Sequence, residues 1–179
     1  SEQQGRIILS DLQVKNGFET WFLVSDDDYD SRIAVQGLNQ LETYEKSPPL
    51  KQIKYNSPDD FEAIVKLISS QKPEALLVFC EPKRSLELIR FLRSRQLELP
   101  VYTQLNLLQE GNFASMSKDR VEAVYFCDNG TWMSDTDSEF VQTFSREFGR
   151  YPGLMAAYAY DAIKILAEAI RKSGPDPQK

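Results

Sequence analysis

The sequence predicts an α/β domain: a Rossmann-like, five-stranded parallel sheet with helices on both faces. Three observations indicate this fold class. Short apolar runs alternate along the chain with amphipathic segments of helical period. After its first residue, the run at 74–80 is continuously apolar, as expected of a strand that is covered on both faces. The chain has 179 residues, which suits one domain, and we expect that domain to span residues 1–179.

Each expected strand is an apolar or alternating run with a clear boundary. The first ends on three aspartates, the second alternates in polarity, and the fourth begins at Pro100. The strands are expected at 18–25, 50–55, 74–80, 100–104 and 121–127. Because crossover connections are right-handed, few strand orders are possible, and we expect the flavodoxin-like order 2-1-3-4-5.

The helices are expected where apolar residues recur every three or four positions. The first has Ile33, Leu38 and Leu41 on one side, and the second follows the capping residue Ser57 and stops at Pro73. The last is apolar on most sides, so we expect it to be covered on most sides. Apart from the second, the helices are expected at 31–45, 84–95, 137–149 and 154–173, with linker-like ends at 1–5 and 175–179.

Composition excludes several kinds of chemistry. The chain has no His, so it has no His-based triad and no His metal ligand, and its two Cys cannot form a four-cysteine zinc site. The net charge of −6 argues against nucleic acid as a partner. The sequence has no glycine-rich phosphate loop and no loop that pairs a nucleophile with a base. We therefore expect no catalysis, no metal and no cofactor.

Cys80 and Cys127 each end an expected strand. In the expected order one strand lies between them, which separates their backbones by about 9–10 Å. A disulfide needs Cα atoms within about 7 Å of each other. The sequence therefore predicts two thiols that act as small apolar residues.

The densest charge cluster, residues 26–30, follows the first expected strand. Its acidic residues fit the first three ligand positions of a calcium loop, but Ser31 and Gly37 stand where that loop needs Gly and Glu. Three interpretations stay open: capping of the following helix, contact with a ligand, and a magnesium site.

Candidate ligand-binding residues follow from the topology, because ligands of such sheets bind beyond the carboxyl ends of the strands. Polar or aromatic side chains stand after strands one, three, four and five. The residues expected to bind a ligand are Asp28, Tyr29, Asp30, Ser31, Cys80, Glu81, Thr103, Gln104 and Asp128.

Several motifs together resemble those of one family. They are Asp28-Tyr29, Asp60-Phe61, Lys72-Pro73-Glu74-Ala75, Phe148-Gly149, Tyr151-Pro152 and Tyr160-Asp161-Ala162. In this order and spacing they resemble the type I periplasmic binding proteins of the leucine/isoleucine/valine-binding family, the solute receptors of branched-chain amino-acid ABC importers. The resemblance extends over nearly the whole chain.

The resemblance implies a non-catalytic, periplasmic or otherwise extracytoplasmic protein whose two lobes close on a small polar ligand such as an amino acid. Residues 6–153 resemble the second lobe, and 154–173 resemble the helix that leads back toward a first lobe outside this chain. The implied partners are that first lobe and a membrane permease or sensor, with Tyr29 as the foremost ligand contact. A homodimer through the helix at 154–173 is a further expectation.

Other interpretations stay open. The segment Leu23–Asp28 resembles the first strand of two-component receiver domains, but Cys80 stands where their phosphoacceptor Asp is expected. Such a module would be receiver-like and inactive. A ligand-sensing or degenerate receptor domain is the second alternative, because Thr103 and Gln104 are uncharged where amino-acid binders of the family often place an acid. An unrelated flavodoxin-like domain is the third.

Overall fold

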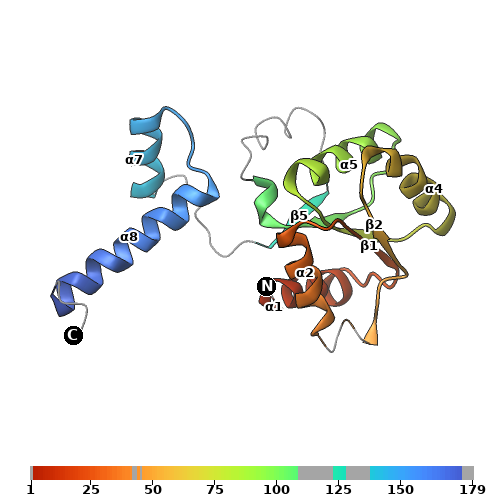
Figure 1. The fold of residues 1–179 in the computed structure, drawn as a ribbon, viewed down its shortest axis with the longest axis horizontal. Helices are drawn as coiled ribbons and strands as arrows, with labels where there is room; N and C mark the ends of the chain where they lie inside the picture. The colour runs from red at the N-terminus through yellow and green to blue at the C-terminus, as the bar shows by residue number, and fades with distance from the viewer. Residues whose placement is uncertain (1, 42–43, 45, 109–122, 128–137, 175–179) are drawn as a thin grey trace. The chain divides into compact units, whose positions relative to one another are not determined.

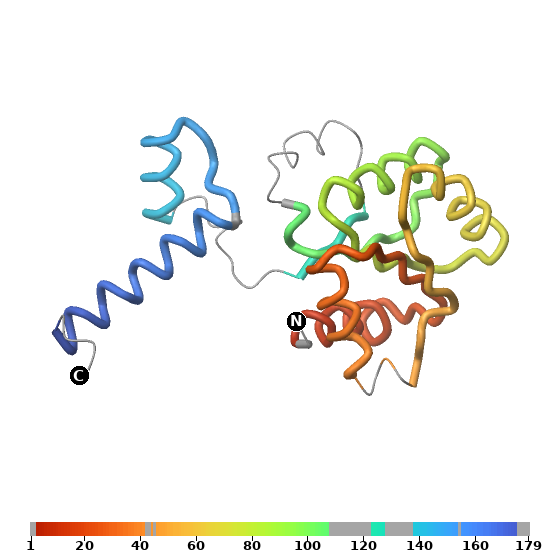
Figure 2. The backbone as a smooth tube through the Cα atoms, viewed as in Figure 1, coloured from red at the N-terminus to blue at the C-terminus, as the bar shows by residue number. Residues whose placement is uncertain are grey.

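The computed structural model describes residues 2–41, 44, 46–108, 123–127 and 138–174, which are coloured in Figure 2. The chain divides into two compact units, residues 1–127 and residues 128–179. The first unit carries the sheet, and the second carries two helices. The single domain expected over residues 1–179 stays a prediction.

The five expected strands form one parallel sheet in the order β2-β1-β3-β4-β5, as predicted (Figure 1). Their bounds are β1 Trp21–Ser25, β2 Lys51–Lys54, β3 Ala75–Phe79, β4 Val101–Thr103 and β5 Val124–Phe126. Every residue of β1, β3 and β4 is buried, whereas β2 and β5 are partly exposed edge strands. The carboxyl ends of all five strands therefore meet at one edge of the sheet.

Helices cover both faces of this sheet, as predicted (Figure 1). In the first unit the helical elements are α1 Glu2–Leu9, the π-helix η1 Ser10–Lys15, α2 Tyr29–Asn39, the 3₁₀ turn η2 Pro58–Asp60, α4 Phe61–Gln71, α5 Pro82–Ser94 and the 3₁₀ turn η3 Leu105–Leu108. On one face Leu23 and Leu77 pack in a cluster with residues of α1 and α2. On the other face Val24 and Val78 pack with residues of α4 and α5. This alternation follows from the two-residue period of a strand.

The N-terminal helix corrects the expectation of a linker-like start at residues 1–5. Helix α1 begins at Glu2, and its apolar side is buried against α2. A Cβ on Gly5 would lie 3.2 Å from side-chain atoms of Leu38 and Leu41. A larger residue here would require these side chains to move by a few tenths of an ångström, and the low helix propensity of glycine hides the helix in the sequence.

Helix α2 begins two residues before the expected start, because the side chain of Asp28 accepts a hydrogen bond from the backbone N–H of Asp30 and caps it. The expectation that Ile33 shares a side with Leu38 is wrong, since Ile33 is 43% exposed. Five residues at about 100° each place these two side chains roughly 140° apart around the helix.

The second unit contains α7 Glu139–Phe148 and α8 Leu154–Ser173, the latter with the predicted bounds. The rings of Phe140 and Tyr160 join the two helices, with centroids 4.6 Å apart. The exposed apolar residues of α8 are Met155, Tyr158, Ile163, Ile165, Leu166 and Ile170. Among the described helices, none is both long and apolar enough to cross a membrane.

One carboxylate ties the starts of two neighbouring strands together. Glu74, just before β3, accepts hydrogen bonds from the backbone N–H of Thr20 at 2.8 Å and of Glu19 at 2.7 Å, just before β1. These donors favour the ionised form, so they hold the pKa of Glu74 below its usual value of 4.5. A lowered folded-state pKa makes the carboxylate stabilising at neutral pH and not in acid.

We expect Glu74→Gln to weaken the acid dependence of stability. In the wild type the contribution of this carboxylate is complete above the ordinary value of 4.5 and is lost as the pH falls through the lowered folded-state pKa. The free energy of unfolding in urea, measured at about pH 6 and about pH 3, checks this. From the higher to the lower pH, the wild type should lose more free energy of unfolding than the variant. An equal loss would contradict the stabilising role of the Glu74 carboxylate.

Candidate functional site

The carboxyl-end edge of the sheet gathers most of the predicted site residues. Helices α2 and α5 both begin at this edge, directly after β1 and β3. The loop after β4 joins it through Gln104, whose Nε2 donates to the backbone carbonyl of Asp30 at 3.2 Å. This hydrogen bond links positions that are 74 residues apart in the chain.

Asp26 anchors this edge. Its carboxylate is fully buried and accepts hydrogen bonds from the backbone N–H of Asp28 at 3.1 Å and of Glu81 at 2.9 Å. The guanidinium of Arg84 lies 3.3 Å from the same carboxylate. One side chain therefore holds the loops after β1 and β3 against each other. The cluster at 26–30 marked this region in the sequence, but nothing in the sequence predicted that Asp26 would be its buried anchor.

Three further residues, at the start of α2, have different surroundings. Tyr29 is 67% exposed at the first position of α2, and Asp30 beside it is also exposed. Ser31 is buried, and its hydroxyl has no hydrogen-bond partner among the residues that the structure describes. Of these three, Tyr29 and Asp30 have the exposure that a direct ligand contact needs, and Ser31 lies beneath the surface.

The capping interpretation of the acidic cluster is confirmed for Asp28, which caps α2. Within the described part of the chain, no group of three or more Cys, Asp or Glu side chains is placed to hold a metal ion. The exposed carboxylate of Asp27 pairs with the Nζ of Lys54 at 2.7 Å instead. The acidic residues here serve capping, anchoring and surface pairing.

The residues directly after β3 also stabilise the fold. The side chain of Glu81 caps α5 by accepting from the backbone N–H of Lys83 and Arg84, each at 3.3 Å. Cys80 is buried, and this burial raises the pKa of its thiol. A thiol held neutral is a poor nucleophile. Cys80 and Cys127 are both buried thiols that are not joined in a disulfide, as predicted.

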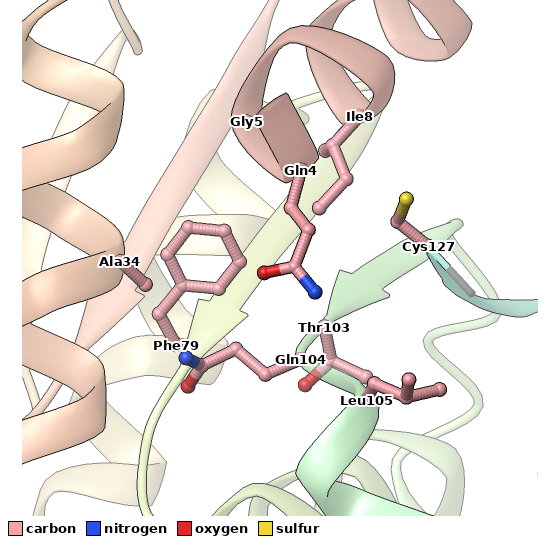
Figure 3. A pocket seen from close by; sticks show the side chains of 9 residues that line it. All are labelled: Gln4, Gly5, Ile8, Ala34, Phe79, Thr103, Gln104, Leu105 and Cys127. Atoms are coloured by element: carbon pink, nitrogen blue, oxygen red, sulfur yellow. The ribbon is translucent and has the colours of Figure 1, made fainter. Parts of the chain in front are cut away.

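A pocket lies at this edge, on the sheet face that α1 and α2 cover (Figure 3). Its cavity volume is about 20 Å³, room for about one water molecule, and it opens to solvent. Among the described residues it is lined by Gln4, Gly5, Ile8, Ala34, Phe79, Thr103, Gln104, Leu105 and Cys127. Figure 3 shows Gln4 reaching from α1 toward Thr103 and Gln104. The pocket therefore includes two of the predicted site residues, Thr103 and Gln104.

Gln4 and Phe79 were missed in the sequence for different reasons. Gln4 belongs to the helix hidden by Gly5, and Phe79 is the last residue of β3, one position before the expected site residue Cys80. The aromatic side chain of Phe79 at the last position of β3 was the available signal. Asp128, the remaining predicted site residue, lies outside the described residues.

The first unit is thus a parallel α/β unit with a pocket and an exposed tyrosine at the carboxyl edge of its sheet. Proteins of this class bind small ligands at that edge. The family model described as periplasmic binding protein matches residues 8–179. The chain belongs to this family.

Several solved structures have a fold similar to that of this chain. The chain has a TM-score of 0.70 and 23% identity to a solute-binding protein of an ABC transporter from Rhodopseudomonas palustris BisB5, in complex with 3,4-dihydroxybenzoic acid, covering 98% of this chain and 49% of that one. The TM-score is also 0.70, at 17% identity, for a branched-chain amino acid transporter substrate-binding protein of Streptococcus pneumoniae in complex with isoleucine. That alignment covers 93% of this chain and 49% of that one. For a leucine-binding protein of Thermotoga maritima the TM-score is 0.67 at 18% identity, and the alignment covers 97% of this chain and 50% of that one.

The chain thus spans about half the length of the solved structures that it matches. Comparison with curated proteins gives no match.

Proposed function

We propose that this chain is one lobe of an extracytoplasmic solute-binding protein, which binds a small polar ligand and delivers it to an ABC-type permease. The main support for this proposal is the carboxyl-end edge of the sheet. An exposed tyrosine lies there near a pocket, and Asp26 holds the loops of this edge together. Membership of the periplasmic binding protein family and the half-length match to solute-binding proteins support it. Binding is the whole activity in this proposal, with no chemical step.

Tyr29 is the proposed principal ligand contact of this lobe. Its ring is 67% exposed at the start of α2, where the cap by Asp28 fixes the backbone. A tyrosine supplies a rigid apolar ring with a hydrogen-bonding tip, so it loses little entropy on binding. The hydrogen bond from Gln104, which lines the pocket, to the carbonyl of Asp30 connects the start of α2 to the pocket.

A second lobe of the parent protein would close over this edge. A hinge movement that buries a ligand from both sides gives more contact area than one lobe provides. The matched solute-binding proteins are about twice as long as this chain, which leaves room for such a lobe. The apolar composition of α8 also favours a packing partner for this helix, and a second copy of this chain is the alternative.

The ligand is proposed to be a small organic acid. The matched proteins were solved with isoleucine and with 3,4-dihydroxybenzoic acid, and both ligands carry a carboxylate. An extracytoplasmic location follows from the same proposal, since the solute has to be captured before import.

We expect Tyr29→Ala to weaken ligand binding by the two-lobed parent protein by at least roughly tenfold, or about 1.4 kcal/mol. Calorimetric titration with leucine, isoleucine, benzoate and 3,4-dihydroxybenzoate first identifies a ligand for the wild type, and the variant is then titrated with it. Tyr29→Phe separates the ring from the hydroxyl. Val14→Ala, at a side chain that is 80% exposed on η1, is the control and should bind like the wild type.

An unchanged affinity in Tyr29→Ala would remove this residue from the site. Absence of binding by the folded wild-type parent to every member of the panel would contradict the proposed class of ligand.

A further inference from the structure

We propose that a second pocket of this chain, between the π-helix η1 and the strands β4 and β5, binds a small aromatic acid. The ring of the acid packs on Tyr125, and its carboxylate pairs with Lys15. The inference is independent of the proposed function, because neither Tyr29 nor Gln104 lines this pocket. Three observations support it: the volume of the pocket, a fixed pair of tyrosine rings and a lysine in its lining.

The second pocket has room for one ring. It lies on the sheet face that α1 covers, and Ile7, Ile8 and Phe126 give it apolar walls. Its cavity volume is about 170 Å³. An apolar cavity of about 150 Å³ in another protein takes up benzene, so a six-membered ring with a small substituent fits here. Ile7 is half-exposed, and the ligand can therefore enter from solvent.

Two stacked tyrosines form an aromatic wall of this pocket. The ring centroids of Tyr102 and Tyr125 lie 5.2 Å apart, and the two planes are inclined by 27°. Tyr102 is buried, whereas Tyr125 is half-exposed, so part of its ring surface is accessible. Aromatic rings attract each other in offset-stacked or edge-to-face arrangements. A ligand ring can therefore pack on Tyr125 and extend the pair.

The π-helix η1 holds the inner tyrosine in place. The hydroxyl of Tyr102 donates to the carboxylate of Asp11 at 2.9 Å and accepts from the side-chain amide of Asn16 at 3.1 Å. The backbone N–H of Asn16 also donates to the carbonyl of Asp11 at 3.0 Å, which is the hydrogen bond of a π turn. Such turns are rare and frequently lie at functional sites. A wall that is already fixed loses little entropy when a ligand binds.

Lys15 gives the pocket its preference for an acid. Its side chain is exposed, and its Nζ pairs with the carboxylate of Asp11 at 2.9 Å. An ammonium group has three N–H donors, so this contact leaves two for a ligand. The carboxylate of Asp11 also accepts from Tyr102 and Asn16, and these donors compensate its charge. A ligand carboxylate can therefore pair with Lys15, whereas a ligand amine would lie beside a cation.

Matched small probes test the inference on the 179-residue chain itself. Benzoate has the ring and the charge, cyclohexanecarboxylate has the charge on a saturated ring, and benzamide has the ring without the charge. In nitrogen–proton correlation spectra we expect benzoate to shift the backbone signals of Ile7, Lys15, Tyr125 and Phe126. Its Kd fitted to these signals should be roughly fivefold below that of cyclohexanecarboxylate and roughly threefold below that of benzamide.

Two variants remove the ring and the charge separately. Tyr125→Leu keeps an apolar side chain and should remove the preference for benzoate over cyclohexanecarboxylate, followed on the signals of Ile7 and Phe126. Lys15→Met keeps the aliphatic stem and should remove the preference for benzoate over benzamide. Lys51→Met makes the same change at an exposed position of β2 and should bind like the wild type. Dispersed spectra establish that each variant is folded.

Equal Kd values of the three probes for the wild type, or no shift of these four signals with benzoate, would overturn the inference. An unchanged preference in Tyr125→Leu or in Lys15→Met would also contradict it. Shifts of the Tyr29 and Asp30 signals in the same spectra report the carboxyl-end edge separately. The proposed function fails only if the two-lobed parent binds no member of its own panel, so the two failures are distinguishable.

Discussion

Replacing Asp26 with alanine is expected to lower the free energy of unfolding by about 3 kcal/mol. The buried carboxylate accepts from the backbone N–H of Asp28 and of Glu81 and pairs with Arg84. Its removal leaves two backbone donors in a buried place without an acceptor, and it separates the loops after β1 and β3. Arg84 is half-exposed and regains water, so the loss stays below that of a fully buried ion pair.

Asp27→Ala is the matched control for this experiment. The same chemical change one residue later removes an exposed carboxylate that, among the described residues, pairs with Lys54. An exposed ion pair contributes little, so its removal should leave the urea unfolding curve nearly unchanged. Equal effects of the two alanine variants would contradict the anchoring role of Asp26.

Leu77→Ala is expected to destabilise the protein by roughly 3 kcal/mol, within the range for Leu-to-Ala changes in a core. Leu77 is fully buried in the central strand β3, opposite Leu23 of β1 and Tyr102 of β4. Its side chain belongs to the cluster with α1 and α2. Neighbours on three sides leave little room for collapse into the cavity that alanine would create.

An aliphatic residue on the edge strand β2 provides the comparison. Ile53 is partly buried and packs against the opposite cluster, and β2 is an edge strand of the described sheet with β1 as its neighbour. Ile53→Ala should therefore lower the free energy of unfolding in urea clearly less than Leu77→Ala does. A loss as large as that of Leu77→Ala would show that the sheet centre is not the most tightly packed part of the core.

The strand order could be predicted from the sequence because it depends on local patterns and one general rule. The apolar run at 75–80 marks the central strand, and right-handed crossovers restrict where its neighbours lie. Helix α1 could not be predicted in this way. Gly5 weakens its helical signal, and the reason for the glycine is a contact with Leu38 and Leu41 that only the folded chain shows.

The sequence predicted which residues follow the strands at the carboxyl-end edge of the sheet, but not the contacts that each of them makes. Four aspartates stand within residues 26–30, and nothing local distinguishes the buried Asp26 from the exposed Asp27. The difference arises from Glu81 and Arg84, which are more than fifty positions away in the chain. Likewise, the orientation of Gln104 depends on the carbonyl of Asp30 across the edge of the sheet.

A side-by-side calorimetric titration of this chain and of the two-lobed parent protein, with the same ligand, tests the central claim most directly. If this chain is one lobe of a solute-binding protein, the parent should bind at least roughly tenfold more tightly, because closure buries the ligand from both sides. Equal affinity of the two proteins, or tighter binding by the chain alone, would show that the site is complete within this unit and would contradict the two-lobed account.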